Sequence, residues 1–136
     1  MQEINFSDIL ERLNGIKFPP IDYVVGIGRS GLLPAAMAAY KIGAGLSLIQ
    51  LNYRDEKNQP CRPQPVLLNS FHIPDGVKDI LLVDDVAVSG QTLSTAKTLL
   101  RDYRVKTLVL KGQADYVLFP AIQDCVNWPW KKLVSA

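Results

Sequence analysis

Short apolar runs alternate along the chain with segments in which apolar residues recur at helical spacing. Continuous β-branched runs are typical of strands buried on both faces of a sheet. Predicted strands cover 21–27, 46–53, 78–85, 105–112 and 115–120, with 65–71 as a further strand or hairpin arm. Predicted helices cover 5–13, 32–42 and 93–103. This alternation predicts an α/β fold with a mostly parallel central sheet flanked by helices.

Residues 54–65 interrupt this pattern with charged side chains, three prolines and no periodicity. We expect a long loop there, of the kind that often carries function. The chain ends in an irregular tail rich in Trp and Pro. At 136 residues it has the length of one domain, so we expect a single domain over 1–136.

Composition narrows the function classes. The chain has 15 Lys and Arg against 13 Asp and Glu, a net charge of +2 that does not favour nucleic acid as a partner. Cys61 and Cys125 are too few for a disulfide framework, and with His72 they make a poor zinc site. The sequence shows neither a secretory signal nor an apolar run of membrane-spanning length, so we expect a cytoplasmic protein with no membrane partner.

Three glycines follow the first predicted strand as G-x-G-x-x-G, at Gly26, Gly28 and Gly31. The pattern is that of a dinucleotide-binding turn, which also needs an acid about 20 residues further on to hold the ribose. No acid occurs between Ala35 and Arg54. The sequence therefore disfavours binding of NAD or FAD.

The same turn carries Arg29 and Ser30 just before a predicted helix. Backbone geometry alone would account for the glycines. It would not account for a cation and a hydroxyl beside the first-turn amides of a helix, which form a ready anion site.

A second stretch, ILLVDDVAVSGQTL, runs from a hydrophobic strand into another helix. Gly90 lets the backbone approach a ligand closely, and Ser89 and Thr92 supply hydroxyl donors. The start of the helix adds unpaired N–H groups and a positive dipole end. These features predict a phosphate cradle, although no Walker-type P-loop is present.

Asp84 and Asp85 precede this cradle at the carboxyl end of the strand. Carboxylates so close to a phosphate are useful if they accept hydrogen bonds from sugar hydroxyls, with a divalent cation nearby. The predicted ligand is a ribose 5-phosphate. The alternative is that the acids and Ser89 only cap a helix.

LLVDDVAVSGQTL also resembles the thirteen-residue signature of type I phosphoribosyltransferases. VGIGRSGLLPAA resembles the pyrophosphate loop of the same family, which often reads Arg-Gly-Gly-Leu-Val-Pro. The two motifs occur in the family's order, and the resemblance covers nearly the whole chain.

This resemblance implies a role for each residue of the two motifs. The 5-phosphate of phosphoribosyl pyrophosphate (PRPP) would be bound by Ala87, Val88, Ser89, Gly90, Gln91 and Thr92. The pyrophosphate would be bound by Arg29, Ser30 and Gly31. Asp84 and Asp85 would bind the ribose hydroxyls, and together with Arg29 they are the predicted catalytic residues. Mg²⁺ would be held mainly by PRPP, with the two acids nearby.

The remaining segments also have implied roles. Residues 53–65, beginning with Tyr53 and Arg54, resemble the family's closing lid. Residues 112–136 resemble the base-binding hood of the xanthine-guanine and hypoxanthine-guanine enzymes. The residues implied to contact the base are Lys111, Val126 and Trp128. For the tryptophans the alternative is packing in the core or in a dimer. The family further implies a homodimer or homotetramer.

The implied reaction is Mg-dependent transfer of the 5-phosphoribosyl group from PRPP to a purine-like nucleobase, with release of pyrophosphate. Three positions depart from the 6-oxopurine pattern. Val88 stands where an aspartate usually handles a proton of the purine, Lys131 stands where an acid is common, and Cys125 replaces a large aromatic residue. A regulatory protein that binds PRPP or a nucleotide with weak or no catalysis is the alternative.

Overall fold

The computed structural model describes residues 1–52, 66–67 and 69–133. Its helices are α1 (Phe6–Asn14), α2 (Leu32–Ile42), α3 (Gln91–Leu99) and the 3₁₀ helix η1 (Pro129–Lys132). Its strands are β1 (Gln2–Glu3), β2 (Tyr23–Ile27), β3 (Gly45–Ile49), β4 (Leu51–Asn52), β5 (Val66–Leu67), β6 (Asp79–Ala87), β7 (Arg104–Gly112), β8 (Tyr116–Val117) and β9 (Val126–Asn127). Within the described ranges, no helix combines the length and the apolar character needed to cross a membrane.

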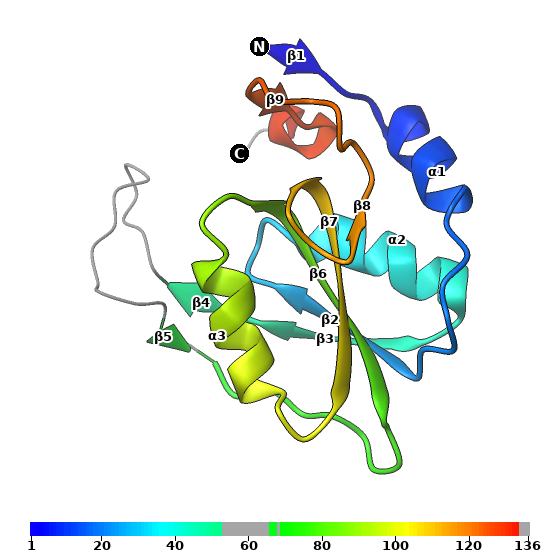
Figure 1. Ribbon diagram of the computed structural model, residues 1–136, viewed down its shortest axis with the longest axis vertical. Helices are drawn as coiled ribbons and strands as arrows, with labels where there is room; N and C mark the ends of the chain where they lie inside the picture. The colour runs from blue at the N-terminus through cyan, green and yellow to red at the C-terminus, as the bar shows by residue number, and fades with distance from the viewer. Residues whose placement is uncertain (53–65, 68, 134–136) are drawn as a thin grey trace.

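Five strands form one parallel sheet in the order β3-β2-β6-β7-β8 (Figure 1). The sequence order reverses beside β2, where the chain moves outward to β3 and then returns to β6. In open parallel sheets, ligands bind beyond the carboxyl ends of the strands at such a reversal. The predicted α/β class is therefore confirmed, and the topology points to the ends of β2 and β6.

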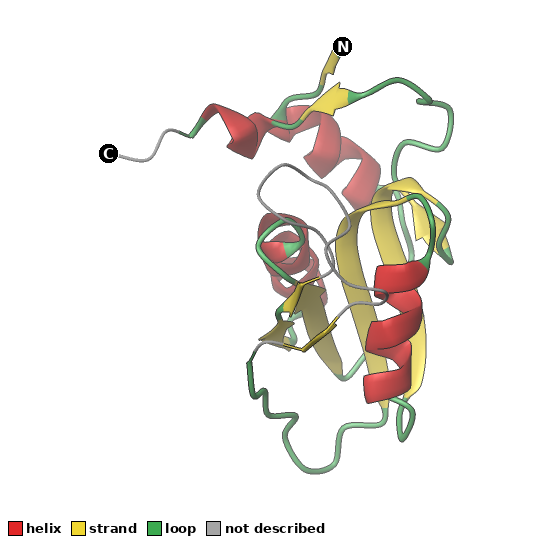
Figure 2. Cartoon of the chain, turned by 90° about the vertical axis from the view of Figure 1, so that its left-hand side faces the viewer, coloured by secondary structure: helices red, strands yellow, loops and turns green. Residues whose placement is uncertain are grey.

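Successive side chains of the central strands point to opposite faces of the sheet, and each face packs in its own hydrophobic core. Val24 and Leu81 pack with α1 and α2, whereas Val25 and Leu82 pack with α3. Figure 2 shows the sheet edge-on between these helices. Both faces of the central strands are covered, which explains why their sequences are continuously hydrophobic rather than alternating.

The prediction of one strand over 46–53 is wrong. The backbone N–H of Gln50 donates to the Asn69 side chain at 2.8 Å, and the same side chain donates to the carbonyl of Leu48 at 3.0 Å. This side chain takes the place of a neighbouring strand, so β3 ends and β4 pairs antiparallel with β5 instead.

The boundaries of β6 and α3, the two elements that flank the predicted phosphate loop, also differ from the prediction. Strand β6 continues to Ala87, so Asp84 and Asp85 lie inside the strand rather than at its end. Helix α3 begins at Gln91 instead of Leu93 and ends at Leu99 instead of Tyr103. The loop between β6 and α3 therefore consists of three residues, Val88, Ser89 and Gly90.

The predicted hood, residues 112–136, is completed by the N-terminal segment. Strand β1 pairs in parallel with β9, and Ile4 packs in one core with Phe119 and Trp128. Figure 1 shows β1, β9 and η1 together beyond the central sheet. The pairing joins residues more than 100 positions apart, which no local sequence pattern reports.

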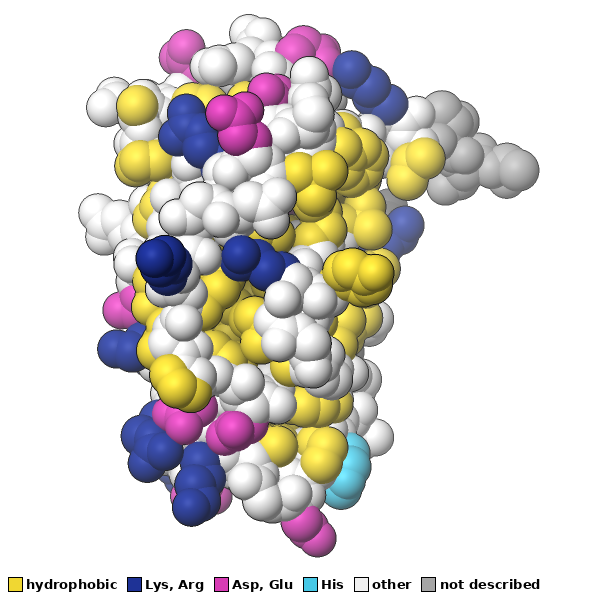
Figure 3. Space-filling view, turned by 90° about the vertical axis from the view of Figure 1, so that its right-hand side faces the viewer, with side chains coloured by type: hydrophobic (Ala, Val, Ile, Leu, Met, Phe, Trp, Pro, Cys, Tyr) yellow, Lys and Arg dark blue, Asp and Glu magenta, His cyan; other side chains and the backbone are white. Residues whose placement is uncertain are grey.

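The face of the molecule shown in Figure 3 carries mixed charge. Its Lys and Arg side chains lie in separate groups, with acidic side chains and an apolar area between them. This distribution agrees with the small net charge of the chain.

Candidate functional site

The two ligand motifs meet at the carboxyl edge of the sheet. Strands β2 and β6 are direct neighbours, with Gly26 opposite Val83. The turn after β2 contacts β6 directly, because Ser30 Oγ donates a hydrogen bond to Asp84 Oδ1 at 3.3 Å. Segments more than 50 residues apart in the sequence thus build one site.

Close contacts or the backbone conformation explain why each of the three positions of the G-x-G-x-x-G turn is a glycine. A Cβ on Gly31 would lie 2.7 Å from the carbonyl oxygen of Ile27 and 2.8 Å from that of Val83. A Cβ on Gly26 would lie 2.7 Å from a side chain of α2. Gly28 has φ of +52°, in the left-handed region that favours glycine. The glycines bring the helix, the turn and β6 together, and they do not identify a dinucleotide.

Helices α2 and α3 both begin at this edge without a capping side chain on their N-cap residues, Gly31 and Gly90, and without an acid in the first turn. Helix α1, by contrast, starts with a complete capping box between Asn5 and Asp8. Unpaired N–H groups at a helix start attract anions, and the dipole adds to this attraction. Arg29 is exposed in the turn before α2 and adds a positive charge. The edge therefore offers two candidate anion sites, the start of α3 and the exposed Arg29. At α2 the Leu32 N–H already donates to the Arg29 carbonyl at 3.1 Å, and Pro34 has no N–H, so Arg29 is the main candidate there.

The loop between β6 and α3 has the form that a phosphate cradle requires. Gly90 has φ of +79°, and the Gln91 N–H donates to Ser89 Oγ at 3.3 Å. Val88 is 84% exposed, so its side chain points away from the core. The residues predicted to bind the 5-phosphate lie in this loop and on either side of it: Ala87, Val88, Ser89, Gly90, Gln91 and Thr92.

Asp84 is a buried acid, with 5% of its surface exposed. Its Oδ1 accepts the N–H of Asp85 at 2.8 Å, and Asp85 Oδ1 accepts the N–H of Val86 at 2.7 Å. Burial, and secondly the adjacent Asp85 carboxylate, raise the pKa of Asp84 well above its usual range. Neither acid forms an ion pair with a described residue. A cation or hydroxyl donors from a ligand would offset the cost of this burial and favour the ionised form of Asp84.

The acids also fit the predicted Mg²⁺. Among the described residues, no group of three or more acidic, His or Cys side chains could hold a metal alone. Mg²⁺ bound to a phosphorylated ligand needs only one or two carboxylates, because waters and phosphate oxygens complete its shell. Asp84 and Asp85 supply that donor set.

The predicted base contacts lie on the hood side of the edge. Lys111 is half-buried, and its Nζ donates to the carbonyl oxygen of Asp124 at 2.7 Å. Val126 is half-buried in β9. Trp128 is only 3% exposed and stacks on Trp130, with ring centroids 5.8 Å apart. A ring buried in the core has no free face for a base, so this placement favours the packing alternative for Trp128.

The predicted lid cannot be compared with the structure, whereas two positions that depart from the 6-oxopurine pattern, Cys125 and Lys131, can. Tyr53 and Arg54 lie outside the described residues, as does the rest of the predicted lid. Cys125 and Lys131 are both exposed on the hood. The part that sequence reasoning missed is the contribution of β1 to this region, because a two-residue strand has no periodicity to detect.

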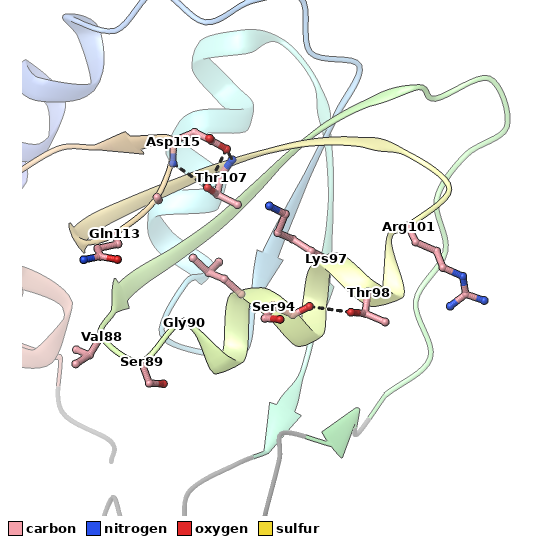
Figure 4. A pocket seen from close by; sticks show the side chains of 12 residues that line it. Val88, Ser89, Gly90, Ser94, Lys97, Thr98, Arg101, Thr107, Gln113 and Asp115 are labelled. Carbon is pink, nitrogen blue, oxygen red and sulfur yellow. Dashed lines mark hydrogen bonds between the residues drawn. The ribbon is translucent and has the colours of Figure 1, made fainter.

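A groove of about 760 Å³ runs along α3 and touches the phosphate loop at Val88 and Gly90, but it does not include the two acids. Figure 4 shows that Lys97 points toward Thr107 while Arg101 points away from it. The two cations do not converge on one point, so the groove does not add a further candidate anion site.

Comparison with known proteins agrees with the geometry. The model of the "Phosphoribosyl transferase domain" family matches residues 5–116. A curated relative, the "Transcriptional regulator GfcR" of Methanothrix thermoacetophila, is 36% identical over 90 residues, which are 66% of this chain and 43% of that protein. The chain spans about half the length of the curated relatives it matches.

Two solved structures share the fold. The purine phosphoribosyltransferase of Pyrococcus horikoshii matches with a TM-score of 0.75 and 20% identity, over 100% of this chain and 98% of the other. The xanthine-guanine-hypoxanthine phosphoribosyltransferase of Helicobacter pylori also reaches a TM-score of 0.75, with 17% identity over 96% and 92% of the two chains. Because the family model matches residues 5–116, most of its length, the chain belongs to the type I phosphoribosyltransferase family.

Proposed function

We propose that the chain transfers the 5-phosphoribosyl group of PRPP to a nucleobase, in a Mg-dependent reaction that releases pyrophosphate. One observation carries the proposal. Two helices without N-terminal side-chain caps follow the neighbouring strands β2 and β6, and the Ser30–Asp84 hydrogen bond ties the turn before α2 to the acid pair of β6. Two anion sites flanking two hydroxyl acceptors match a sugar with a phosphate at one end and a pyrophosphate at the other.

The two anion sites take different parts of PRPP. The loop from Ala87 to Thr92 holds the 5-phosphate, which keeps the sugar in place throughout the reaction. The turn with Arg29 and Ser30 holds the pyrophosphate. Negative charge grows on this group as it leaves, so the Arg29 guanidinium stabilises the transition state more than the ground state.

In the proposed reaction a nitrogen of the base bonds to C1 of the ribose. The C1–O bond to pyrophosphate breaks, its electron pair leaves with the pyrophosphate, and the proton of the attacking nitrogen passes to solvent. Asp84 and Asp85 accept hydrogen bonds from the ribose hydroxyls, and their charge stabilises the positive charge that develops on the ring. Mg²⁺, when held by PRPP beside these acids, supplies positive charge to the phosphate oxygens.

A purine-like base is the proposed acceptor, placed between the end of β7 and the hood. Lys111 supports this placement because it is the cation at the end of β7, beside the hood. Val88 supplies no proton acceptor at the loop. We therefore propose that solvent removes the proton from the attacking nitrogen. Product formation with a panel of nucleobases identifies the acceptor base.

The second candidate is a regulatory domain that binds PRPP or a nucleotide and does not turn it over. Two observations favour it: the curated relatives carry the name of a transcriptional regulator, and Val88 replaces a proton acceptor. Against it, the Arg29 turn supplies a pyrophosphate site that a sensor of 5-phosphates alone would not need. In either role we propose a cytoplasmic homodimer or homotetramer.

Binding of PRPP is tested by thermal stabilisation. Ligand at 100 times its Kd stabilises the native state by about 2.7 kcal/mol, so PRPP with Mg²⁺ should raise the melting temperature by several degrees. NAD at the same concentration should leave it unchanged. The Asp85→Asn variant, which loses a charged acceptor, is the matched control and should show a smaller shift. Equal shifts with PRPP and NAD would contradict the site assignment.

A further inference from the structure

The base-side segment, Asp124–Asn127, is held from two directions. From the sheet, Lys111 Nζ donates to the Asp124 carbonyl at 2.7 Å. From the N-terminal segment, the Gln2 N–H donates to the Cys125 carbonyl at 3.0 Å. Strand β9 lies outside the five-stranded sheet, and β1 is its partner strand. The position of this segment therefore depends on β1 as well as on Lys111.

Glu3 supplies the side-chain part of the β1 anchor. Its Oε1 accepts Asn127 Nδ2 at 2.8 Å, and its Oε2 pairs with Lys132 Nζ at 2.8 Å. The hydrogen bond from Lys132, and secondly that from Asn127, lower the pKa of Glu3. One carboxylate thus ties β9 to η1, the two elements on either side of Trp128.

Strand β1 is anchored to the core by the residues that follow it, so its pairing with β9 can fix the position of β9. Ile4 is 5% exposed and packs in the same core as Trp128. The capping box between Asn5 and Asp8 starts α1 directly after β1, and Ile9 of α1 is fully buried. In contrast, two paired strands of two residues each would be only marginally stable alone.

We infer that Glu3 is a positioning residue for the acceptor base. It holds the base-side segment in the place that receives the base, while the PRPP half of the site does not depend on it. This inference rests on the proposed function. Glu3 acts through Asn127 and Lys132 and is not itself a contact of the base.

The first measurement separates the two substrates. The side chains of Lys132 and Glu3 are 60% and 59% exposed. In the full chain, Glu3→Ala should therefore raise the KM for the base only about twofold to fivefold, the factor expected when an exposed charged contact is lost. Affinity for PRPP should stay within experimental error. Glu3→Gln keeps an acceptor for Asn127 and loses the ion pair, so it should fall between wild type and Glu3→Ala. Glu11→Ala is the matched control, because Glu11 is an exposed acid of α1 whose side chain bonds to no described residue.

The second measurement needs no turnover. Cys125 is an exposed free thiol within the base-side segment. In a Cys61→Ser background, so that Cys125 reports alone, its alkylation by iodoacetamide should be several-fold faster in Glu3→Ala than in the Glu11→Ala control. Hydrogen exchange of residues 124–127 should accelerate in parallel.

Faster alkylation together with a selective rise in the KM for the base supports the inference. Unchanged alkylation overturns it, as does an unchanged KM for the base. An equal loss of PRPP affinity also overturns it, because Glu3 would then have only a general structural role. Failure of the proposed function is seen separately in the wild-type protein, as absence of PRPP binding or of product with every base.

Discussion

Asp84→Asn should raise the melting temperature of the unliganded protein at neutral pH and weaken PRPP binding in the same variant. Burial costs the ionised Asp84 its hydration, and the neighbouring Asp85 carboxylate adds repulsion. An asparagine keeps an oxygen that can accept from Ser30 and from the Asp85 N–H, and it removes the charge. Relief of this cost should stabilise the protein by about 1–3 kcal/mol, the usual desolvation penalty of such a group.

The pH dependence of stability follows from the raised pKa of Asp84. A carboxyl group whose pKa is higher in the folded state contributes most to stability below its unfolded pKa. That contribution is lost as the pH rises through the folded pKa. The stability of Asp84→Asn relative to wild type should therefore grow as the pH is raised from acid to neutral. Thermal unfolding at several pH values measures this directly.

The same change should cost PRPP binding about tenfold to a hundredfold, because a charge-assisted hydrogen bond to the ribose is lost. Asp102→Asn is the control, since Asp102 is exposed and its side chain bonds to no described residue. Calorimetric titration with PRPP and Mg²⁺ measures the loss. A variant that is less stable than wild type at neutral pH, or that binds PRPP equally well, would contradict the assignment of Asp84.

Gly31→Ala should destabilise the protein by about 3 kcal/mol, the upper range of overpacking in a core. The added methyl group would meet two carbonyl oxygens at less than 3.0 Å, and the Asp84 Cα at 3.1 Å. These are backbone atoms of β2 and β6, which cannot rotate away as a side chain would. The turn must then move, and PRPP affinity should fall with stability.

Gly28→Ala is the matched control in the same turn. Gly28 has a positive φ but open space around its Cα, so alanine should cost only about 1 kcal/mol of left-handed backbone strain. Urea unfolding of both variants compares the two costs. If Gly28→Ala proved as damaging as Gly31→Ala, close packing would not be the reason for Gly31.

Much of the sheet can be predicted because its central strands are buried on both faces. Continuous apolar runs mark β2, β6 and β7, and their alternation with helices predicts the parallel order. The Ser30–Asp84 contact depends further on β2 and β6 being neighbours in the sheet, a strand order that the sequence pattern does not give. The break after Ile49 depends instead on the side chain of Asn69, which lies 20 residues away and gives no periodic signal.

The hood is harder to predict for the same physical reason. Its order comes from the pairing of β1 with β9 and from the Glu3 contacts, all of which join distant parts of the chain. Trp128 is an example. The sequence is compatible with a base contact or with core packing, and the burial of Trp128 among distant core residues favours packing. The two motifs proposed to bind PRPP are each continuous in the sequence, so their residues can be recognised without knowledge of distant contacts.

The most direct test of the central claim is product formation by the wild-type protein. PRPP, Mg²⁺ and each of xanthine, guanine, hypoxanthine, adenine, uracil and orotate are incubated with it, and the nucleoside 5-monophosphate and pyrophosphate are quantified together. We expect the nucleoside 5-monophosphate and pyrophosphate to be released in equal amounts with at least one purine. We expect neither product to form with the Asp85→Asn variant. Tight PRPP binding without product from any base would contradict the proposed transfer and favour the regulatory role.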